Sequence, residues 1–567
     1  MELFSSQVLS CFTSHIMFPS RTTLGNGEKM VIPKTQQRIC PLDIKPTDDL
    51  LKYHDASDMN SNYLFNNNNN NVDGPNNIGD FYAGTKIFIT GATGFVGKAL
   101  VEKLLRSCDG IDTIYLLMRD KRGMCIEQRL KELLKNPVFG KIRDKNPEVF
   151  EKVKAINGDV SLPNLSLSEN DKNFLRENID VVFHSAATVK FNEDLKNAVL
   201  LNTLGTKRVL ELCQGMKNLK SFVHVSTAFS NSDKSHIKET VYKPAFDMNS
   251  IINCMDILPK DIVEMLSKKL LGKHPNTYTF TKALAEYIVL EYSSTIPAAV
   301  VRPSIITAAW KEPIPGWVDN MSGITGIFME CGRGTIKSII CNEKYVMDII
   351  PVDIVVNTII SAGWHTSAYK SNTMRVYNCV TGGINPVTWK KFGELTHKYV
   401  REYPSKYVQW YPGFQYRTNR FIHVLYATLY HTVPAALLDV FLYCTRQKPI
   451  MLRISNKFYH ALDAGKFFST NEWDFDTHTF ASLSQAVKHA EDGKCFNIDI
   501  NKKTTDFDWE SYVKNFMIGV RQYVLKDDMS SLPSARAKLV RLYWFQKVFQ
   551  VLSLCALVKI ASLRYQR

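Results

Sequence analysis

The sequence lacks the residue patterns that form disulfide frameworks or bind metal ions. Its 12 cysteines include no Cys-x-x-Cys pair, and its 13 histidines do not occur in a metal-ligand spacing such as His-Glu-x-x-His. We therefore expect reduced thiols and no metal site. The first residues, MELFSSQVLSCF, lack a basic leading region and a long apolar run. A secretory signal is not expected, and the chain should begin in the cytosol.

Acidic residues are in the minority: 55 Asp and Glu oppose 70 Lys and Arg, a formal net charge of +15. This charge suits nucleic acid, an anionic membrane surface or a phosphate-bearing substrate. Residues 535–567 contain no acidic residue, and cations interrupt their apolar and aromatic positions. The pattern favours an interfacial helix on anionic lipid, or a marginal span from Val548 onward. We therefore expect membrane lipid, and not nucleic acid, as a partner.

The chain divides into segments of different composition. Residues 1–80 show no sustained apolar period and include LFNNNNNNVDGPNNIGD, so they are expected to form a disordered Asn-rich tail. From residue 81 to 360, short β-rich apolar runs alternate with helix-length segments. This alternation predicts an α/β fold, a Rossmann-type doubly wound parallel sheet with helices on both faces. Residues 529–567 are the basic apolar tail, expected to associate with membranes.

A glycine-rich turn follows the first predicted strand. Residues 85–100, TKIFITGATGFVGKAL, pass from an apolar strand through glycines into an apolar-periodic helix. Gly91 permits the turn, Gly94 lets the backbone approach a pyrophosphate, and Gly97 lets the helix pack closely on the strand. A glycine turn placed directly between strand and helix predicts a dinucleotide site, with a merely structural turn as the alternative.

Ligands of such sheets bind at the carboxyl ends of the strands. The residues expected there are Gly91, Arg119, Asp159, Ala186, Ser226 with Thr227, and Arg302. The second strand is followed by LLMRDKRG, in which the cations Arg119, Lys121 and Arg122 outnumber Asp120. A cation at this position accepts the extra phosphate of NADP, whereas an acid favours the bare ribose of NAD. We expect NADPH, and a solvated charged turn is the alternative.

The segment NTYTFTKALAEYIVLEY, residues 276–292, carries Tyr278 and Lys282 one helical turn apart. Such pairs are common by chance, but this one follows the glycine turn and HVSTAF, where Ser226 and Thr227 end a strand. Reduction of a carbonyl leaves charge on oxygen, which needs a proton donor and hydrogen-bond donors. Tyr278 would give the proton, and Lys282 would lower its pKa and hold the nicotinamide ribose. Thr227 or Ser226 would orient the carbonyl.

Together these motifs resemble the fatty acyl-CoA reductases of the insect and plant male-sterility type, within the extended short-chain dehydrogenase/reductases. The motifs TGATGFVGKALVEKLL, GDV, HSAATVKF, FVHVSTAF, YTFTKALAE, VVRPSI and DIIPVDIVVN follow the order of that family's reductase domain, from about Thr85 to Asn357. HTVPAALLDVFLY and NEWDFDTHTF resemble its C-terminal domain, to about Val524. The resemblance implies a mainly helical domain over residues 361–528.

The resemblance also implies an activity and a set of site residues. The activity is NADPH-dependent reduction of a long-chain fatty acyl-CoA to a primary fatty alcohol with release of CoA, and it requires no nucleophilic cysteine. The family's catalytic Tyr and Lys fall on Tyr278 and Lys282, and its hydroxyl position falls best on Thr227, with Ser226 as a contender. The expected cofactor contacts are Gly91, Thr93, Gly94, Phe95, Val96, Gly97, Arg119, Lys121, Arg122, Asp159, Val160, Ala186 and Lys282. The cations Lys268, Lys269 and Lys273 suit either CoA phosphates or a solvated helix face.

A second apolar segment, residues 421–444, contains His423, His431 and Asp439 and has Pro434 near its middle. Its length permits a membrane span. Cations precede and follow the segment, namely Arg417, Arg420, Arg446 and Lys448. We expect a re-entrant hairpin with both ends on the cytosolic side, and a buried helix pair of a soluble protein is the alternative.

Two other functions share part of this evidence. Another membrane-associated extended reductase, acting on sterols or aldehydes, would carry the glycine turn and the Tyr-Lys pair but not the C-terminal motifs. A non-catalytic dinucleotide-binding scaffold at lipid surfaces would not need Tyr278 and Lys282. We expect the enzyme, attached to the endoplasmic reticulum or another organelle, with its catalytic domain facing the cytosol.

Overall fold

The N-terminal boundary of the fold lies at a short helix. The computed structural model describes residues 76–121, 123–369, 371 and 373–565, so most of the predicted tail lies outside the described residues. Residues 76–80 are nevertheless part of the fold. They enter helix α2 (Ile78–Tyr82), where the N–H groups of Ile78 and Gly79 donate to the Asp492 carboxylate at 2.9 and 2.7 Å. A carboxylate at a helix N-terminus satisfies N–H groups that have no partner within the helix.

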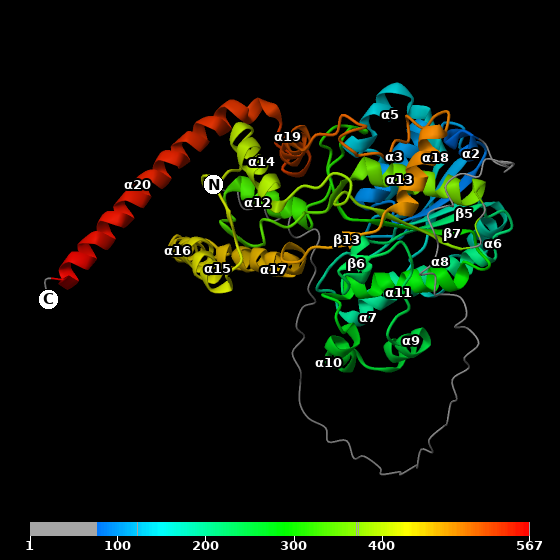
Figure 1. The fold of residues 1–567 in the computed structure, drawn as a ribbon, viewed down its shortest axis with the longest axis horizontal. Helices are drawn as coiled ribbons and strands as arrows, with labels where there is room; N and C mark the ends of the chain where they lie inside the picture. Colours follow the sequence, from blue (N-terminus) through cyan, green and yellow to red (C-terminus); the bar gives the residue numbers. More distant parts are fainter. Residues whose placement is uncertain (1–75, 122, 370, 372, 566–567) are drawn as a thin grey trace, which may run out of the picture. The chain divides into compact units, whose positions relative to one another are not determined.

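Within the described part of the chain, seven parallel strands form the central sheet (Figure 1). In spatial order they are β11 (Arg375–Cys379), β7 (Ala298–Pro303), β5 (Ser221–Val225), β4 (Val181–His184), β1 (Lys86–Thr90), β2 (Thr113–Met118) and β3 (Val153–Asn157). Every neighbouring pair is parallel. The order of connection reverses between β1 and β4, which opens the crevice where doubly wound sheets bind nucleotides. The predicted Rossmann-type sheet is confirmed.

Helices cover both faces of this sheet because successive side chains of a strand point to opposite faces and here both sets are apolar. In β1, Ile87 and Ile89 pack into one buried core, and Phe88 packs into the other. The first face is covered by α3 (Phe95–Ser107) and α13 (Val352–Ala368), and the second by α8 (Leu204–Gln214) and α11 (Thr277–Tyr292). Each strand therefore contributes side chains to both cores, one on each face of the sheet.

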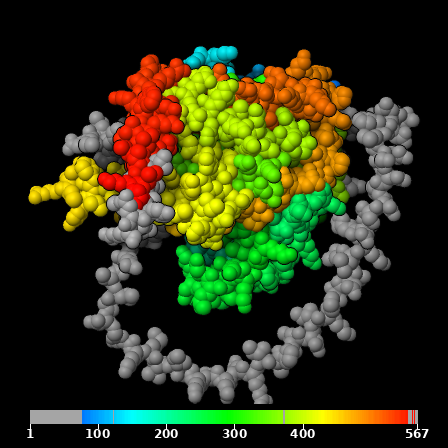
Figure 2. All heavy atoms as spheres, turned by 60° about the vertical axis from the view of Figure 1, so that its left-hand side comes forward, coloured from blue at the N-terminus to red at the C-terminus, as the bar shows by residue number. Residues whose placement is uncertain are grey.

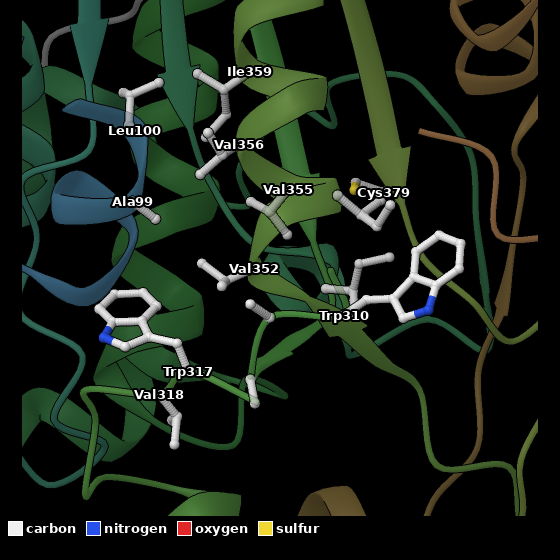
Figure 3. Close-up of a cluster of buried hydrophobic side chains, with 14 of the residues drawn as sticks. Ala99, Leu100, Trp310, Trp317, Val318, Val352, Val355, Val356, Ile359 and Cys379 are labelled. Carbon is white, nitrogen blue, oxygen red and sulfur yellow. The ribbon is translucent and has the colours of Figure 1, made fainter. Parts of the chain in front are cut away.

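Figure 3 shows the first of these cores around α13. Val352, Val355, Val356 and Ile359 of this helix face the α3 side chains and the loop with Trp310 and Trp317, and every one of them is buried. The register of β11 places Arg375 beside Ala299 of β7. The domain boundary predicted at residue 360 thus falls inside α13, and the sheet continues beyond it. The last strand and the helix that leads into it share one core with the preceding residues.

The remaining elements frame the sheet. The helices before α13 are α4 (Ile126–Leu134), α5 (Gly140–Lys145), α6 (Glu169–Asn178), α7 (Leu195–Ala198), α9 (Met248–Ile257), α10 (Lys260–Leu271) and α12 (Ile324–Arg333). Later helices are α14 (Trp389–Glu402), α18 (His478–His489) and α19 (Trp509–Gly519). Short parallel pairs join β8 (Ile305–Thr307) to β10 (Ile349–Pro351), β9 (Ser338–Ile340) to β12 (Gln415–Arg417), and β6 (His236–Ile237) to β13 (Asp474–Phe475). The last two pairs connect the C-terminal segments to the reductase part.

The apolar segment forms one continuous helix and does not turn at Pro434. It comprises α15 (Arg420–Ala427), the π-helical turn η7 (Thr428–Thr432) and α16 (Val433–Cys444), with Pro434 in the first turn of α16. Proline lacks a backbone N–H, and a π-helical turn just before it rearranges the hydrogen bonds that an uninterrupted helix would need. The chain reverses after Cys444, and α17 (Met451–Ser469) packs back against α16. The predicted hairpin within residues 421–444 is therefore wrong: these residues form one helix, and the chain reverses only after it.

Polar residues inside this apolar helix bind to the rest of the protein. His423 Nδ1 lies 2.9 Å from Ser338 Oγ, and His431 Nε2 accepts the Lys337 N–H at 2.9 Å. The Asp439 carboxylate accepts two backbone N–H groups at the start of α17, at 2.8 and 2.9 Å. One helix in the described part of the chain, residues 420–444, is long and apolar enough to cross a membrane. The polar contacts of His423, His431 and Asp439 join this helix to the rest of the protein.

The C-terminal helix α20 (Leu532–Tyr565) is attached to the protein at its beginning. Ala535 and Leu539 are buried, and the Arg536 guanidinium donates to the Glu402 carbonyl at 2.9 Å. Farther along, apolar side chains are exposed, for example 63% of Trp544. Figure 2 shows the helix in red on the surface. Its first turns therefore belong to the fold, and its later turns present apolar surface to the surroundings.

Candidate active site

The glycine turn between β1 and α3 admits no side chain at two positions. Gly91 has φ +80°, and a Cβ there would lie 2.6 Å from the Ala186 backbone nitrogen. A Cβ at Gly97 would lie 2.3 Å from the Gly91 carbonyl oxygen. Thr93 and Gly94 are exposed, and Gly94 caps α3. The first N–H groups of this helix thus face an open approach at the reversal point of the sheet, as a bound pyrophosphate requires.

Phe95 and Val96 follow the glycine turn, and their side chains pack against the protein interior. Both are partly buried, and the Phe95 ring packs against Trp317 with ring centroids 5.2 Å apart. Side chains so engaged hold the start of α3 in place. The predicted cofactor contacts of Phe95 and Val96 would therefore be made through the backbone N–H groups of the first helical turn.

The predicted ribose-phosphate residues lie at the end of β2. Arg119 Nη1 donates to Asp159 Oδ2 at 2.6 Å, so two predicted cofactor residues contact each other across neighbouring strands. Burial raises the pKa of Asp159, but hydrogen bonds from Ser161 and Arg119 outweigh it and hold the pKa below its usual value. Lys121 is exposed, and Arg122 lies outside the described residues. Among the described residues of this turn, Arg119 and Lys121 carry positive charge.

Two further predicted contacts are backbone positions. Val160 accepts a hydrogen bond on its carbonyl from Arg208 at 3.0 Å, and the Ala186 N–H donates to Thr90 Oγ1 at 3.3 Å. Val160 follows the outermost strand β3, and Ala186 follows β4, which borders the reversal point. The structure therefore gathers the glycine loop, Asp159 and Ala186 at one edge of the sheet.

Asn202 connects the loop after β4 to the helix with the Tyr-Lys pair. Its side chain accepts the Thr188 N–H at 2.8 Å and donates to the Thr188 carbonyl at 3.1 Å and to Thr281 Oγ1 at 3.0 Å. Asn202 is buried. The sequence did not predict this residue, because a lone Asn in an apolar helical segment carries no local signal and its partners are distant in the chain.

Tyr278, Lys282 and Thr227 meet at the carboxyl end of β5. Asn276 is the N-cap of α11, the helix that carries the pair, and its side chain accepts the Thr279 N–H at 2.9 Å. One turn later, Lys282 Nζ donates to the Val225 carbonyl at 2.7 Å. The Tyr278 and Thr227 side chains are hydrogen bonded to each other. The predicted triplet of hydroxyl, phenol and ammonium is therefore assembled at the ligand edge.

The pKa values in this triplet differ from the expectation. Burial raises the pKa of Tyr278 to about 12, although the hydrogen bond from Thr227 opposes the shift. Burial lowers the pKa of Lys282 to about 8, although the charge of Glu286 opposes it. The predicted lowering of the Tyr278 pKa by Lys282 does not occur, because loss of solvation penalises the phenolate more than its neighbours favour it. The phenol is protonated at neutral pH, as a proton donor must be.

Ser226 has a different environment from its neighbour Thr227. Its hydroxyl donates to Glu286 Oε1. The Glu286 carboxylate also binds the Arg302 guanidinium, with Nη2 to Oε2 at 2.6 Å and Nε to Oε1 at 3.0 Å. All three side chains are buried. Ser226 and Arg302, both predicted at the ligand edge, thus belong to an internal network, and Thr227 alone of the two hydroxyls contacts Tyr278.

Other predicted contacts stay predictions. Lys268, Lys269 and Lys273 are exposed on α10 or just after it, which fits both a CoA-phosphate site and a solvated face. Within the ranges that the structure describes, no group of three or more His, Cys, Asp or Glu residues could hold a metal ion.

The parallel sheet with its glycine loop at the reversal point is the architecture of dinucleotide-binding proteins. The NAD-binding family model described as "Male sterility protein" matches residues 89–359, and a second model of that description matches residues 430–527. The chain belongs to the fatty acyl-CoA reductase family. It is similar to fatty acyl-CoA reductase 1 of Rattus norvegicus, with 39% identity over 479 residues, covering 84% of this chain and 92% of the relative.

Two further similarities agree with this membership. Fatty acyl-CoA reductase 2 of Mus musculus is 36% identical over 465 residues, covering 82% of this chain and 89% of the relative. Among solved structures, the reductase domain of a nonribosomal peptide synthetase from Mycobacterium tuberculosis aligns with a TM-score of 0.52 and 18% identity, covering 80% of this chain and 94% of that domain. This last likeness shows a shared fold.

Proposed function

We propose that the protein reduces a long-chain fatty acyl-CoA to a primary fatty alcohol, with NADPH as the reductant and with release of CoA. The observation that carries this proposal is the assembly of Thr227, Tyr278 and Lys282 at the same sheet edge as the glycine loop, in a chain of the fatty acyl-CoA reductase family. Conversion of a thioester to an alcohol takes two reductions, and the first of them releases the thiol.

The residues of this edge fit a bound dinucleotide. The glycine loop would hold the pyrophosphate on the first N–H groups of α3, and Lys282 would hold the nicotinamide ribose. The nicotinamide would supply the hydride to the substrate carbonyl. Tyr278 would donate the proton to the oxygen, and its pKa of about 12 keeps it protonated at neutral pH. Thr227 would hold the same oxygen by a hydrogen bond as charge develops on it.

The preference for NADPH is supported by Arg119. Its side chain is 53% exposed and pairs with Asp159 at 2.6 Å. A guanidinium binds a phosphate monoester with two charge-assisted hydrogen bonds, so the extra phosphate of NADPH would compete well for Arg119. NADH offers only a ribose hydroxyl at this position.

Attachment to the cytosolic side of a membrane is supported by two apolar surfaces. The helix of residues 420–444 exposes 77% of Phe421 and 66% of Leu437, and cations flank both of its ends. The later turns of α20 are the second surface. Long acyl chains partition into bilayers, since each buried methylene contributes about 0.8 kcal/mol. An enzyme resting on the bilayer meets this substrate at high local concentration.

The test is incubation of the purified protein with acyl-CoAs of graded chain length and either NADPH or NADH, followed by identification of the lipid and thiol products. We expect fatty alcohol and free CoA from long chains with NADPH, and neither product from Tyr278→Phe. Accumulation of aldehyde as the end product would restrict the proposal to the first reduction. Turnover of sterols or free aldehydes without any turnover of acyl-CoA would contradict it.

A further inference from the structure

An aromatic cluster links the Tyr278 site to the end of α17. We call it the aromatic wall, and it consists of Phe191, Phe229, Phe468, Trp473 and Phe475. Ring centroids lie 6.0 Å apart for Tyr278 and Phe191, and 5.2 Å apart for Phe191 and Phe468. Phe229 lies 5.2 Å from Phe468 and 5.3 Å from Trp473. The rings thus form a continuous apolar surface that starts at the proposed proton donor.

The aromatic wall borders a cavity and is only partly buried. The lining includes Phe229, Phe468, Trp473 and Phe475, and the enclosed volume is about 10 Å³, roughly one water molecule. Phe229 and Phe475 are buried, whereas Phe191, Phe468 and Trp473 remain partly exposed. Aromatic side chains that serve only as core are usually enclosed on all sides, and partly exposed apolar surface beside a polar site is typical of ligand binding.

The chain position of Phe229 fixes where a substrate would touch the wall. Phe229 follows Thr227 by two residues, and its N–H donates to Thr227 Oγ1 at 3.3 Å. A carbonyl oxygen held by Thr227 and Tyr278 therefore brings the methylenes next to that carbonyl against Phe229. The adjoining rings of Phe468 and Trp473 would receive the following methylenes, because they extend the same surface.

Helix α17 leads from this wall to the apolar helix. Phe468 stands in its last turn, and the helix runs from the region of α16, which it contacts, toward β13 (Figure 1). Its 19 residues span about 28 Å, which exceeds the extended length of a common long acyl chain. One helix therefore connects the exposed apolar surface of residues 420–444 with the residues that handle the carbonyl.

We propose that the aromatic wall binds the acyl chain: the rings nearest Tyr278 contact the first methylenes, and Phe468 and Trp473 contact methylenes beyond those of a hexanoyl group and so determine the preference for chain length. This inference rests on the proposed function, because it takes the acyl group as the ligand. A cavity of about 10 Å³ is too small for an acyl chain, so binding at this place requires the Phe468 side chain to move. The rest of the chain then follows α17 toward the apolar helix.

The test compares Phe468→Ala with the matched control Phe174→Ala. Phe174 lies on α6, and its ring centroid is 5.2 Å from that of Tyr115 on β2. We would measure kcat/KM with hexanoyl-CoA and palmitoyl-CoA, and the Kd of both ligands by equilibrium dialysis. Loss of two methylene contacts lowers the palmitoyl-to-hexanoyl ratio of kcat/KM about 15-fold. The Kd ratio should change in the same sense, and the control should leave both ratios unchanged.

Several outcomes would overturn the inference. Equal losses for both chain lengths, or an unchanged ratio, would make Phe468 a packing residue only. Phe468→Leu serves where the alanine variant does not fold, as judged by circular dichroism, and an unchanged ratio in that variant counts equally against the wall. Failure of the proposed function has a different signature: the wild-type protein would bind palmitoyl-CoA more tightly than hexanoyl-CoA and reduce neither.

Discussion

Thr227 and Ser226 are adjacent hydroxyls, and removal of each should affect a different property. Thr227→Val deletes the hydroxyl that is hydrogen bonded to Tyr278 while it keeps the shape of the side chain. Loss of one hydrogen-bond donor to a developing oxyanion typically lowers kcat about 100- to 1,000-fold. Thr227 also accepts the Phe229 N–H at 3.3 Å, so a stability loss of about 1 kcal/mol should accompany the kinetic loss.

Ser226→Ala removes a buried hydrogen bond to Glu286, whose carboxylate keeps the Arg302 guanidinium at 2.6 and 3.0 Å. A hydrogen bond to a charged group contributes about 1.5–3 kcal/mol, so we expect that loss in the free energy of unfolding. The remaining ion pair still joins α11 to β7, so kcat/KM should change by less than about 3-fold.

For both variants we would measure the initial rate of NADPH oxidation in the presence of palmitoyl-CoA, and the free energy of unfolding by denaturant titration. Thr227→Ser is the matched control because it retains the hydroxyl, and it should keep most of the wild-type rate. A large rate loss in Ser226→Ala together with near-normal turnover by Thr227→Val would refute the reasoning and assign the carbonyl contact to Ser226.

Other perturbations test the proton donor, the cofactor, the ammonium and the C-terminal helix. Tyr278→Phe should lower turnover roughly 100- to 10,000-fold while NADPH binding by fluorescence titration survives; near-normal turnover would exclude Tyr278 as the donor. Arg119→Ala should weaken NADPH binding more than NADH binding, and equal losses would place Arg119 away from the ribose phosphate. Lys282 is protonated below its pKa of about 8, so kcat/KM should fall as the pH rises through that value, and a flat profile there would argue against a role for its charge. Removal of residues 543–567, which leaves the buried Ala535 and Leu539 in place, should weaken membrane flotation and long-chain activity but spare short acyl-CoAs; unchanged flotation and long-chain activity would show that residues 420–444 suffice for attachment.

The sequence by itself determined the elements whose signals are local. A strand, a glycine turn and a helix start are contiguous at residues 85–100, and the steric demands at Gly91 and Gly97 are visible in the spacing alone. The alternation of apolar runs predicted the parallel sheet, and the four-residue spacing of Tyr278 and Lys282 placed both on one helix face. These features depend on backbone geometry and side-chain period over a few residues, which a sequence shows directly.

The tertiary structure decided everything that depends on distant partners. It gave Thr227 and Ser226 different hydrogen-bond partners, because Glu286 of α11 and Arg302 of β7 approach Ser226. It set the pKa of Tyr278, because burial depends on the whole surrounding fold. It made residues 420–444 one helix where we predicted a hairpin around Pro434, because the π-helical turn before Pro434 accommodates the missing N–H without a break in the helix. It also brought α17 beside the catalytic edge, since the rings that meet there come from segments more than 200 residues apart in the chain, Phe191 and Phe468 among them. Contacts across such separations leave no local pattern, so only packing reveals them.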